Sequence, residues 1–163
     1  MREYKFRGKR TGNGEWVYGY YVGPVAGDNS HEICDIKSVC GNRTDVIPET
    51  VGQYTGLKTK DIETYKHDVI GFYVIENLDE PDEVKIIVAT AQIVWNDDYG
   101  CWDLKWLKGS QNEMTDICDI GIDDSYDYLL YNLLEYFDNE SSQWNGYEII
   151  GNIYDNPELS EGK

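Results

Sequence analysis

The chain has 163 residues, of which 31 are acidic and 14 basic, so its formal net charge is −17, and 40% of its residues are hydrophobic. This length supports one domain, or one domain with a small subdomain, and an aromatic content of 13% excludes a disordered acidic tail. No apolar run approaches the roughly 18 residues of a membrane-spanning helix, and the charged N-terminus indicates no secretory signal, so we expect a cytoplasmic protein.

The first third of the chain predicts β structure. Apolar and charged residues alternate over 3–8, a turn signal rich in Gly and Asn follows at 11–14, and residues 15–22 form a long aromatic and β-branched run. Together they predict a hairpin. Residues 33–39 alternate again and predict a further strand, and Pro48 marks a break because it has no amide donor.

The middle of the chain predicts a second β unit. Residues 68–75 read as a strongly apolar strand, and 84–95 as one long, bent strand or two strands. The turn signal at 96–100 leads into a return strand at 101–106. Short, bent strands that close on themselves favour a small barrel, which removes exposed edges.

One amphipathic helix is predicted over about residues 124–138. Large apolar residues recur there at helical spacing, which is more typical of core packing than of a partner groove: Tyr126, Leu129, Leu130, Leu133, Leu134 and Phe137. Residues 147–150 return to β structure, and 160–163 are expected to fray. The predicted fold class is therefore mainly β with one helix.

The sequence shows no recognisable arrangement of catalytic residues. The sequence contains no Gly-rich phosphate loop, and we interpret His67 as part of a strand start rather than a catalytic group. His31, Cys34 and Cys40 form the one ligand-like cluster, but zinc sites usually need a second tight pair, so packed free thiols are the preferred interpretation. We expect no enzyme activity, no cofactor and no metal.

The aromatic residues favour an interaction protein. Tyr and Trp are the preferred anchors of interfaces, and the chain has more of them than one small core needs. The candidate interaction surface consists of Arg7, Trp16, Tyr18, Tyr20 and Trp102.

Several sequence blocks resemble the YopX family, small proteins encoded by phages and prophages of Gram-positive bacteria. The matching blocks are 4–10, 15–19, 46–58, 65–70 and 148–159, of which Gln-Tyr-Thr-Gly-Leu at 53–57 is the most specific. The resemblance implies a largely β fold with an SH3-like barrel in the second half. Together with the predicted helix, we therefore expect an N-terminal β region at 1–60 and an SH3-like barrel region with the inserted helix at 61–159. It implies no activity and no catalytic residues. We interpret residues 53–56 as a tight turn with Tyr54 packed.

The expected function is that of a non-enzymatic phage or prophage accessory protein in the bacterial cytoplasm. It would act by self-assembly or by binding a phage or host protein, with no membrane contact. Residues 1–60 carry a net charge of +2 and residues 61–163 one of −19. This acidity suggests an alternative, an acidic mimic of nucleic acid that occupies a host DNA-binding protein. A second alternative is a small β-barrel that binds nucleic acid, although the negative field disfavours contact with phosphates.

Overall fold

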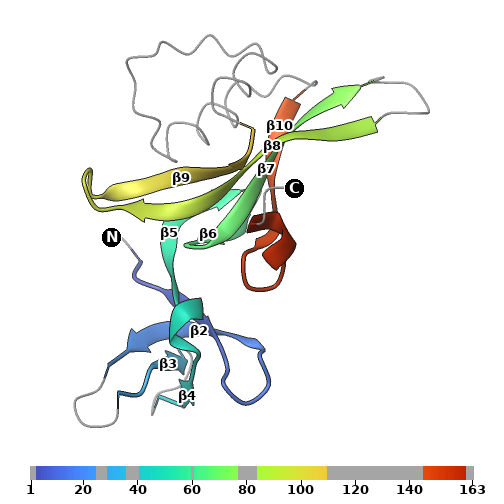
Figure 1. Ribbon diagram of the computed structural model, residues 1–163. Helices are drawn as coiled ribbons and strands as arrows, with labels where there is room; N and C mark the ends of the chain where they lie inside the picture. Colours follow the sequence, from blue (N-terminus) through green and yellow to red (C-terminus); the bar gives the residue numbers. More distant parts are fainter. Residues whose placement is uncertain are drawn as a thin grey trace. The chain divides into compact units, whose positions relative to one another are not determined.

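The computed structural model describes residues 3–24, 29–35, 41–59, 61–76, 84–109 and 145–160, and the chain is mainly β (Figure 1). It divides into two compact units, Met1–Lys66 and His67–Lys163. Among the described residues, each unit has its own sheet, of six strands in the first and four in the second. No helix among the described residues is long and apolar enough to cross a membrane.

The first unit contains a six-stranded sheet in the order β4-β3-β2-β1-β5-β6. Its strands are β1 (Phe6–Lys9), β2 (Trp16–Val22), β3 (Glu32–Asp35), β4 (Arg43–Asp45), β5 (Gly52–Thr59) and β6 (Ile62–Tyr65), with a short 3-10 helix η1 (Pro48–Thr50) before β5. The predicted hairpin is confirmed, because β1 and β2 pair antiparallel with Phe6 opposite Gly19 and Lys9 opposite Trp16. The strand predicted at 33–39 begins one residue earlier, and residues 36–40 lie outside the described part of the chain.

One face of this sheet is apolar. Ile33 and Val46 are almost fully buried, and the ring centroids of Phe6 and Tyr21 lie 5.6 Å apart. Because side chains alternate along a strand, the charged residues of β1, Arg7 and Lys9, lie on the opposite face of the sheet.

The block at residues 53–57 forms a bulged strand rather than the predicted tight turn. The register between β5 and β6 shifts between Tyr54 and Lys58, and Gly56 takes a φ of 90° inside the bulge. Buried threonines hold the bulge, with Thr55 Oγ1 and Thr64 Oγ1 2.5 Å apart and Thr64 donating to the Leu57 carbonyl at 3.0 Å. Tyr54 is buried, as predicted.

The strand β6 belongs to the first sheet because it pairs with β5. The compact units consequently divide between Lys66 and His67, whereas the sequence interpretation places residues from 61 onwards in the second region. A turn at Lys66 and His67, where His67 has a φ of 77°, connects the two sheets.

The second unit contains an antiparallel sheet in the order β10-β7-β8-β9. Its strands are β7 (Asp68–Glu76), β8 (Val84–Asn96), β9 (Cys101–Lys108) and β10 (Asn145–Asn152), and the 3-10 helix η2 (Pro157–Ser160) follows them. Residues 84–96 form one long strand, which decides between the two alternatives left open by the sequence. Register shifts interrupt its pairing with both neighbours. Such bulges bend and twist a strand, and the sheet curls into a half-barrel.

The core of the second unit lies against the middle of β7 and β8. Val69, Ile70, Phe72, Ala91 and Ile93 are each fully buried. Aromatic packing extends this core to β9, where the ring of Trp106 lies 5.5 Å from that of Phe72. The helix predicted over 124–138 lies outside the described residues, and only residue 160 of the predicted frayed tail lies within them.

Candidate interaction surface

The first two strands bring cations and aromatic rings together on one face of the first unit. Lys5, Arg7 and Lys9 alternate along β1 and the residue before it, and Trp16, Tyr18 and Tyr20 alternate along β2. The strand register places Arg7 opposite Tyr18 and Lys9 opposite Trp16, so both sets project to the same side. We call these six residues the cation–aromatic face.

Arg7 lies at the centre of this face, buried between two rings. Its guanidinium carbon is 4.6 Å from the centroid of the Trp16 ring and 4.8 Å from that of Tyr65 in β6, and the residue is only 8% exposed. Arg7 thus supports the face from beneath instead of forming part of its outer surface, which corrects its predicted role as a contact residue. A guanidinium stacked between rings gains both cation–π attraction and packing of its stem.

Other cations also lie over the rings. The Lys9 amine is 5.5 Å from the Trp16 centroid, and the Lys5 amine is 5.9 Å from that of Tyr18. The negative faces of these rings are therefore already matched by the protein's own positive charges. The outer surface of the face consequently favours neutral, aromatic or anionic groups over further cations.

Two tyrosines of β2 stand out from the face. Tyr18 is 46% exposed and Tyr20 is 53% exposed, while Trp16 is half-buried. Burying a large aromatic side chain in a partner interface contributes about 1.5–3 kcal/mol or more, and tyrosine can add a hydrogen bond. The structure thus places three of the five predicted surface residues side by side on one strand.

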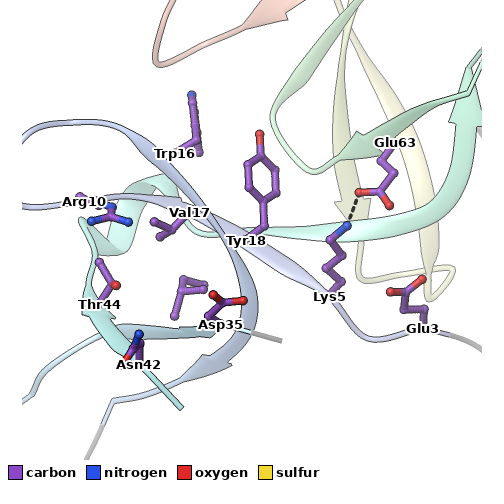
Figure 2. A pocket seen from close by; sticks show the side chains of 11 residues that line it. Glu3, Lys5, Arg10, Trp16, Val17, Tyr18, Asp35, Asn42, Thr44 and Glu63 are labelled. Atoms are coloured by element: carbon purple, nitrogen blue, oxygen red, sulfur yellow. Dashed lines mark hydrogen bonds and ion pairs between the residues drawn. The ribbon is translucent and has the colours of Figure 1, made fainter. Parts of the chain in front are cut away.

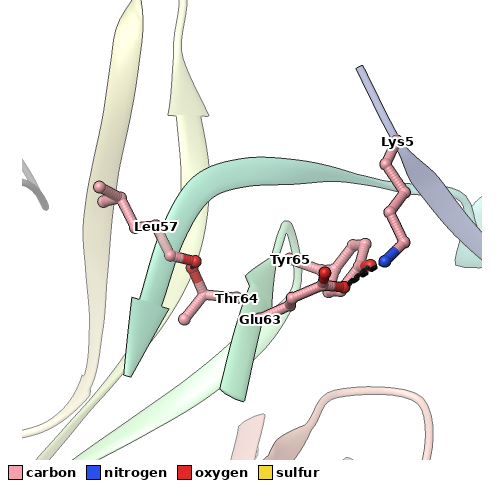
Figure 3. Close-up of polar contacts among 5 residues, drawn as sticks. All are labelled: Lys5, Leu57, Glu63, Thr64 and Tyr65. Atoms are coloured by element: carbon pink, nitrogen blue, oxygen red, sulfur yellow. Dashed lines mark hydrogen bonds and ion pairs between the residues drawn. The ribbon is translucent and has the colours of Figure 1, made fainter. Parts of the chain in front are cut away.

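A polar network, not found by the sequence analysis, anchors the edge of this face (Figure 3). Glu63 Oε2 accepts hydrogen bonds from the Lys5 amine at 2.5 Å and from the Tyr65 hydroxyl at 2.6 Å. Tyr65 is buried, and its ring also packs edge-on against Tyr18 at 5.8 Å. The only signal in the sequence is the alternation of Lys5, Arg7 and Lys9, because the partners from β6 are about 60 residues away along the chain.

The network perturbs the acidity of its members. Burial and the hydrogen bond to Glu63 raise the pKa of Tyr65 well above its ordinary value. Burial alone would raise the pKa of Glu63, but the hydrogen bonds from Lys5 and Tyr65 outweigh it and lower that pKa below 4.5. At neutral pH the carboxylate is therefore charged and the phenol neutral, which is the state that the hydrogen bonds require.

We expect Glu63→Gln to destabilise the first unit by about 1 kcal/mol at neutral pH, because it removes a charge-assisted hydrogen bond and an ion pair. A carboxyl group with a lowered pKa stabilises the fold above its unfolded pKa and loses this contribution as the pH falls through the folded value. The difference between the two proteins should thus shrink in acid. Urea unfolding at neutral pH and at about pH 3 measures this, with Glu3→Gln, an exposed cleft residue, as the control. A difference that stays constant in acid would contradict the proposed charge state.

An open cleft of about 730 Å³ borders the face (Figure 2). Trp16 and Tyr18 point to the same side of β2, with Arg10 near one end of the cleft and the Lys5–Glu63 ion pair near the other. The guanidinium of Arg10 is exposed and has no hydrogen-bond or ion-pair partner in the part of the chain that the structure describes. Volumes of this order are typical of sites that receive a ligand or a few side chains of a partner.

Trp102 does not belong to this surface. It lies in β9 of the second unit, is 8% exposed and packs edge-on against Trp95 at a ring distance of 5.1 Å. Its predicted role as a surface contact is corrected to one in packing. Its indole N–H has no hydrogen-bond partner among the described residues.

The ligand-like cluster of the sequence is only partly described. The hydroxyl of Tyr21 hydrogen-bonds to His31 Nδ1, and the half-buried Cys34 is a free thiol. Cys40 lies outside the described residues. Within the described ranges, no three or more His, Cys, Asp or Glu side chains gather closely enough to hold a metal ion.

Comparison with known protein families identifies the family of this chain. A family model described as YopX protein matches residues 5–161. The chain belongs to the YopX family. This match confirms the resemblance seen in the sequence blocks, and both sheets and the cation–aromatic face lie within the YopX match. No curated protein matches the chain.

Proposed function

We propose that this YopX-family chain is a non-enzymatic accessory protein of a phage or prophage, acting in the bacterial cytoplasm by contact with another protein. The partner is a second copy of the chain or a phage or host protein. The cation–aromatic face carries this proposal. Tyr18 and Tyr20 leave large aromatic areas in water, and the sandwiched Arg7 holds the neighbouring ring in place.

The side chains of the cation–aromatic face are already held in position without a partner, which supports the proposal. The rings of Trp16 and Tyr65 enclose Arg7, and Lys5 is tied to Glu63, so binding would freeze little additional side-chain motion. A surface whose anchors are already positioned loses less entropy on association. Aromatic residues above a rigid support are typical of the centres of protein interfaces.

We also propose that the second unit is an SH3-like barrel. Four antiparallel strands with bulges in every pairing support this assignment, because bulges let short sheets curl towards closure. On this proposal the barrel is a scaffold and the first unit carries the binding surface. Folds of this kind support many functions, so the barrel itself argues for none of them.

We expect the double variant Tyr18→Ser/Tyr20→Ser to lose association while remaining folded, because both side chains are about half exposed. The experiment is affinity capture with the tagged full chain from cells that carry the phage, combined with sedimentation of the purified chain. Ile62→Ser, which removes a 57% exposed apolar side chain of β6, is the matched control. A monomer at tens of micromolar that also captures no protein would contradict the proposal, as would a double variant that associates like the wild type.

Single-stranded nucleic acid is the second candidate partner. Alternate residues of a strand lie roughly 6.8 Å apart, and bases stack on aromatic rings beside cations. It ranks second because Lys5 is paired with Glu63 and Arg7 is buried, which leaves fewer charges for phosphates. A fluorescence titration at low salt tests it. Micromolar binding that weakens with salt would place nucleic acid first, and no binding would reject it.

A further inference from the structure

The hairpin of β7 and β8 runs out beyond the other two strands of its sheet (Figure 1). The pairing of β10 with β7 ends at Val74, and the pairing of β9 with β8 ends at Thr90. Past these positions β8 pairs on one side only, with β7. In the part of the chain that the structure describes, the other edge of β8 has no strand partner over Val84–Ala89. We call Val84–Ala89 the open edge.

The open edge exposes apolar side chains of high β propensity. Val84 is 47% exposed and Ile86 is 37% exposed, and both lie on the same face of the hairpin because side chains alternate along a strand. Four of the six residues in the sequence Val-Lys-Ile-Ile-Val-Ala are β-branched. In an antiparallel pair, every second residue of an edge strand directs its N–H and C=O groups away from its partner strand. Such an edge is a template for pairing with a further strand.

The one charged side chain of the open edge is turned away from it. Lysine on an edge strand commonly blocks pairing with another chain. The Lys85 amine, however, bonds to the Glu148 carboxylate and lies 3.8 Å from the centroid of the Tyr73 ring. Tyr73 belongs to β7 and Glu148 to β10, so the Lys85 side chain crosses the sheet in the direction opposite to the open edge. Its charge is thus already matched within the chain.

The strand β8 also lacks the negative charge that would keep two copies apart. The chain has a net charge of −17, but residues 84–96 contain no Asp or Glu. Glu76, opposite Val84, is on β7 and so on the side of the hairpin away from the open edge. At physiological salt the Debye length is about 8 Å, so repulsion from more distant charges is largely screened. The composition of the open edge therefore allows it to approach a second copy of itself.

We propose that the open edges of two copies pair antiparallel, which joins the two four-stranded sheets through β8. A contact between identical edges is isologous, so it closes as a dimer. A pairing of a few residues buries less surface than the roughly 1,200 Å² of a stable interface, so the dimer is weak and concentration-dependent.

Two-fold symmetry restricts the register of this contact. Opposite residues must share a face of the joined sheet, so the symmetry axis passes beside one residue of the edge. An axis at Lys85 would place like charges directly opposite each other, which destabilises a strand pair. An axis at Ile87 would run the contact into the bulge at Val88. The register centred on Ile86 avoids both, and it packs Ile86 of one copy beside Ile86 of the second copy.

This contact lies on the second unit and does not rest on the proposed function, which concerns the cation–aromatic face. Association of the wild type would then have two parts. One part is the dimer through β8, and the other is capture of partners through Tyr18 and Tyr20, which the Tyr18→Ser/Tyr20→Ser variant loses.

Cysteine crosslinking of the full chain tests the contact and its register. Ile86→Cys would place two thiols opposite each other with Cα atoms about 4.5–5.5 Å apart, which a disulfide can bridge. Val84→Cys is the matched control, because its two thiols would lie four residues apart along the paired strands, about 13 Å, beyond the reach of a disulfide. Both side chains are exposed, so both variants should unfold like the wild type. The wild type, oxidised in parallel, gives the background from its four native cysteines.

Oxidation with diamide should give about tenfold more disulfide-linked dimer from Ile86→Cys than from Val84→Cys or the wild type. Equal amounts of dimer from the two variants, or none from either, would overturn the proposal. In sedimentation velocity, Ile86→Lys should dimerise about tenfold more weakly than the wild type, because like charges would then face each other. Unchanged sedimentation of Ile86→Lys would also overturn it.

Adding Tyr18→Ser/Tyr20→Ser to the Ile86→Cys variant separates this inference from the proposed function. Crosslinking that persists while capture of other proteins is lost supports both. Crosslinking that persists with capture unaffected supports the pairing at β8 and contradicts the proposed function. Crosslinking that disappears with the two tyrosines shows that the copies meet through the cation–aromatic face, which overturns the pairing at β8 and leaves the proposed function standing.

Discussion

Replacing Gly19 with alanine is expected to destabilise the first unit by about 3 kcal/mol or more, because overpacking against backbone cannot be relieved by a rotamer change. Gly19 lies in β2, between β1 and β3. A Cβ atom at this position would come within 2.0 Å of the Cys34 carbonyl oxygen and 2.7 Å of its carbon. The strands would have to separate, which would also displace the rings of the cation–aromatic face.

Gly12→Ala is the matched control for this substitution. Nothing lies within 4 Å of a Cβ atom built at Gly12, so the free energy of unfolding should change by less than about 0.5 kcal/mol. Urea unfolding followed by circular dichroism compares the two variants. Equal stability of the two variants would contradict the close approach of β2 and β3 at Gly19.

Arg7→Ala is expected to cost about 2–4 kcal/mol of stability, since it removes a buried stem and two cation–π contacts. The guanidinium lies between the rings of Trp16 and Tyr65, so its loss leaves a gap beneath the face. Arg7→Lys should fall between the wild type and the alanine variant, because an ammonium cannot stack between two planes as a guanidinium does.

Arg10→Ala controls for the loss of a positive charge. Arg10 is exposed and has no ion pair in the described part of the chain, so its removal should change the free energy of unfolding by less than about 0.5 kcal/mol. Both variants are compared with the wild type by chemical unfolding monitored through tryptophan fluorescence. If Arg7→Ala and Arg10→Ala proved equally mild, Arg7 would not be the central support of the face.

Local patterns in the sequence predict most of the individual strands. The alternation over 3–8, the aromatic run at 15–22 and the turn signal at 96–100 all indicate structure that the backbone adopts. These features depend on neighbouring residues alone, through side-chain alternation and the preference of Gly and Asn for turns. The family resemblance was also visible in the sequence blocks and is confirmed.

Features that depend on distant residues were missed. The pairing of β5 with β1 places Gln53 opposite Phe6, and no local pattern encodes that register. The burial of Arg7 follows from this pairing because Tyr65 of β6 then covers it, so an apparently solvated cation becomes a packed one. For the same reason Trp102, interpreted as a surface anchor, is buried: its burial depends on Trp95 across the β8–β9 hairpin.

The backbone conformation at Gly56 could be predicted from the sequence only in part. The sequence correctly indicates an unusual backbone conformation, because glycine is the residue that tolerates a φ of 90° without strain. A tight turn and a bulge both use this property, and only the pairing of Tyr54 with Tyr65 and of Lys58 with Glu63 distinguishes them.

Hydroxyl-radical footprinting of the free and associated chain tests the central claim, that the cation–aromatic face is the binding surface. Oxidation of Tyr18 and Tyr20 is measured at low concentration and again where the chain associates or holds a captured partner, with the exposed Ile62 as internal reference. The account predicts that both tyrosines become protected while the modification of Ile62 stays constant. Equal oxidation of Tyr18 and Tyr20 in the free and associated states would contradict it.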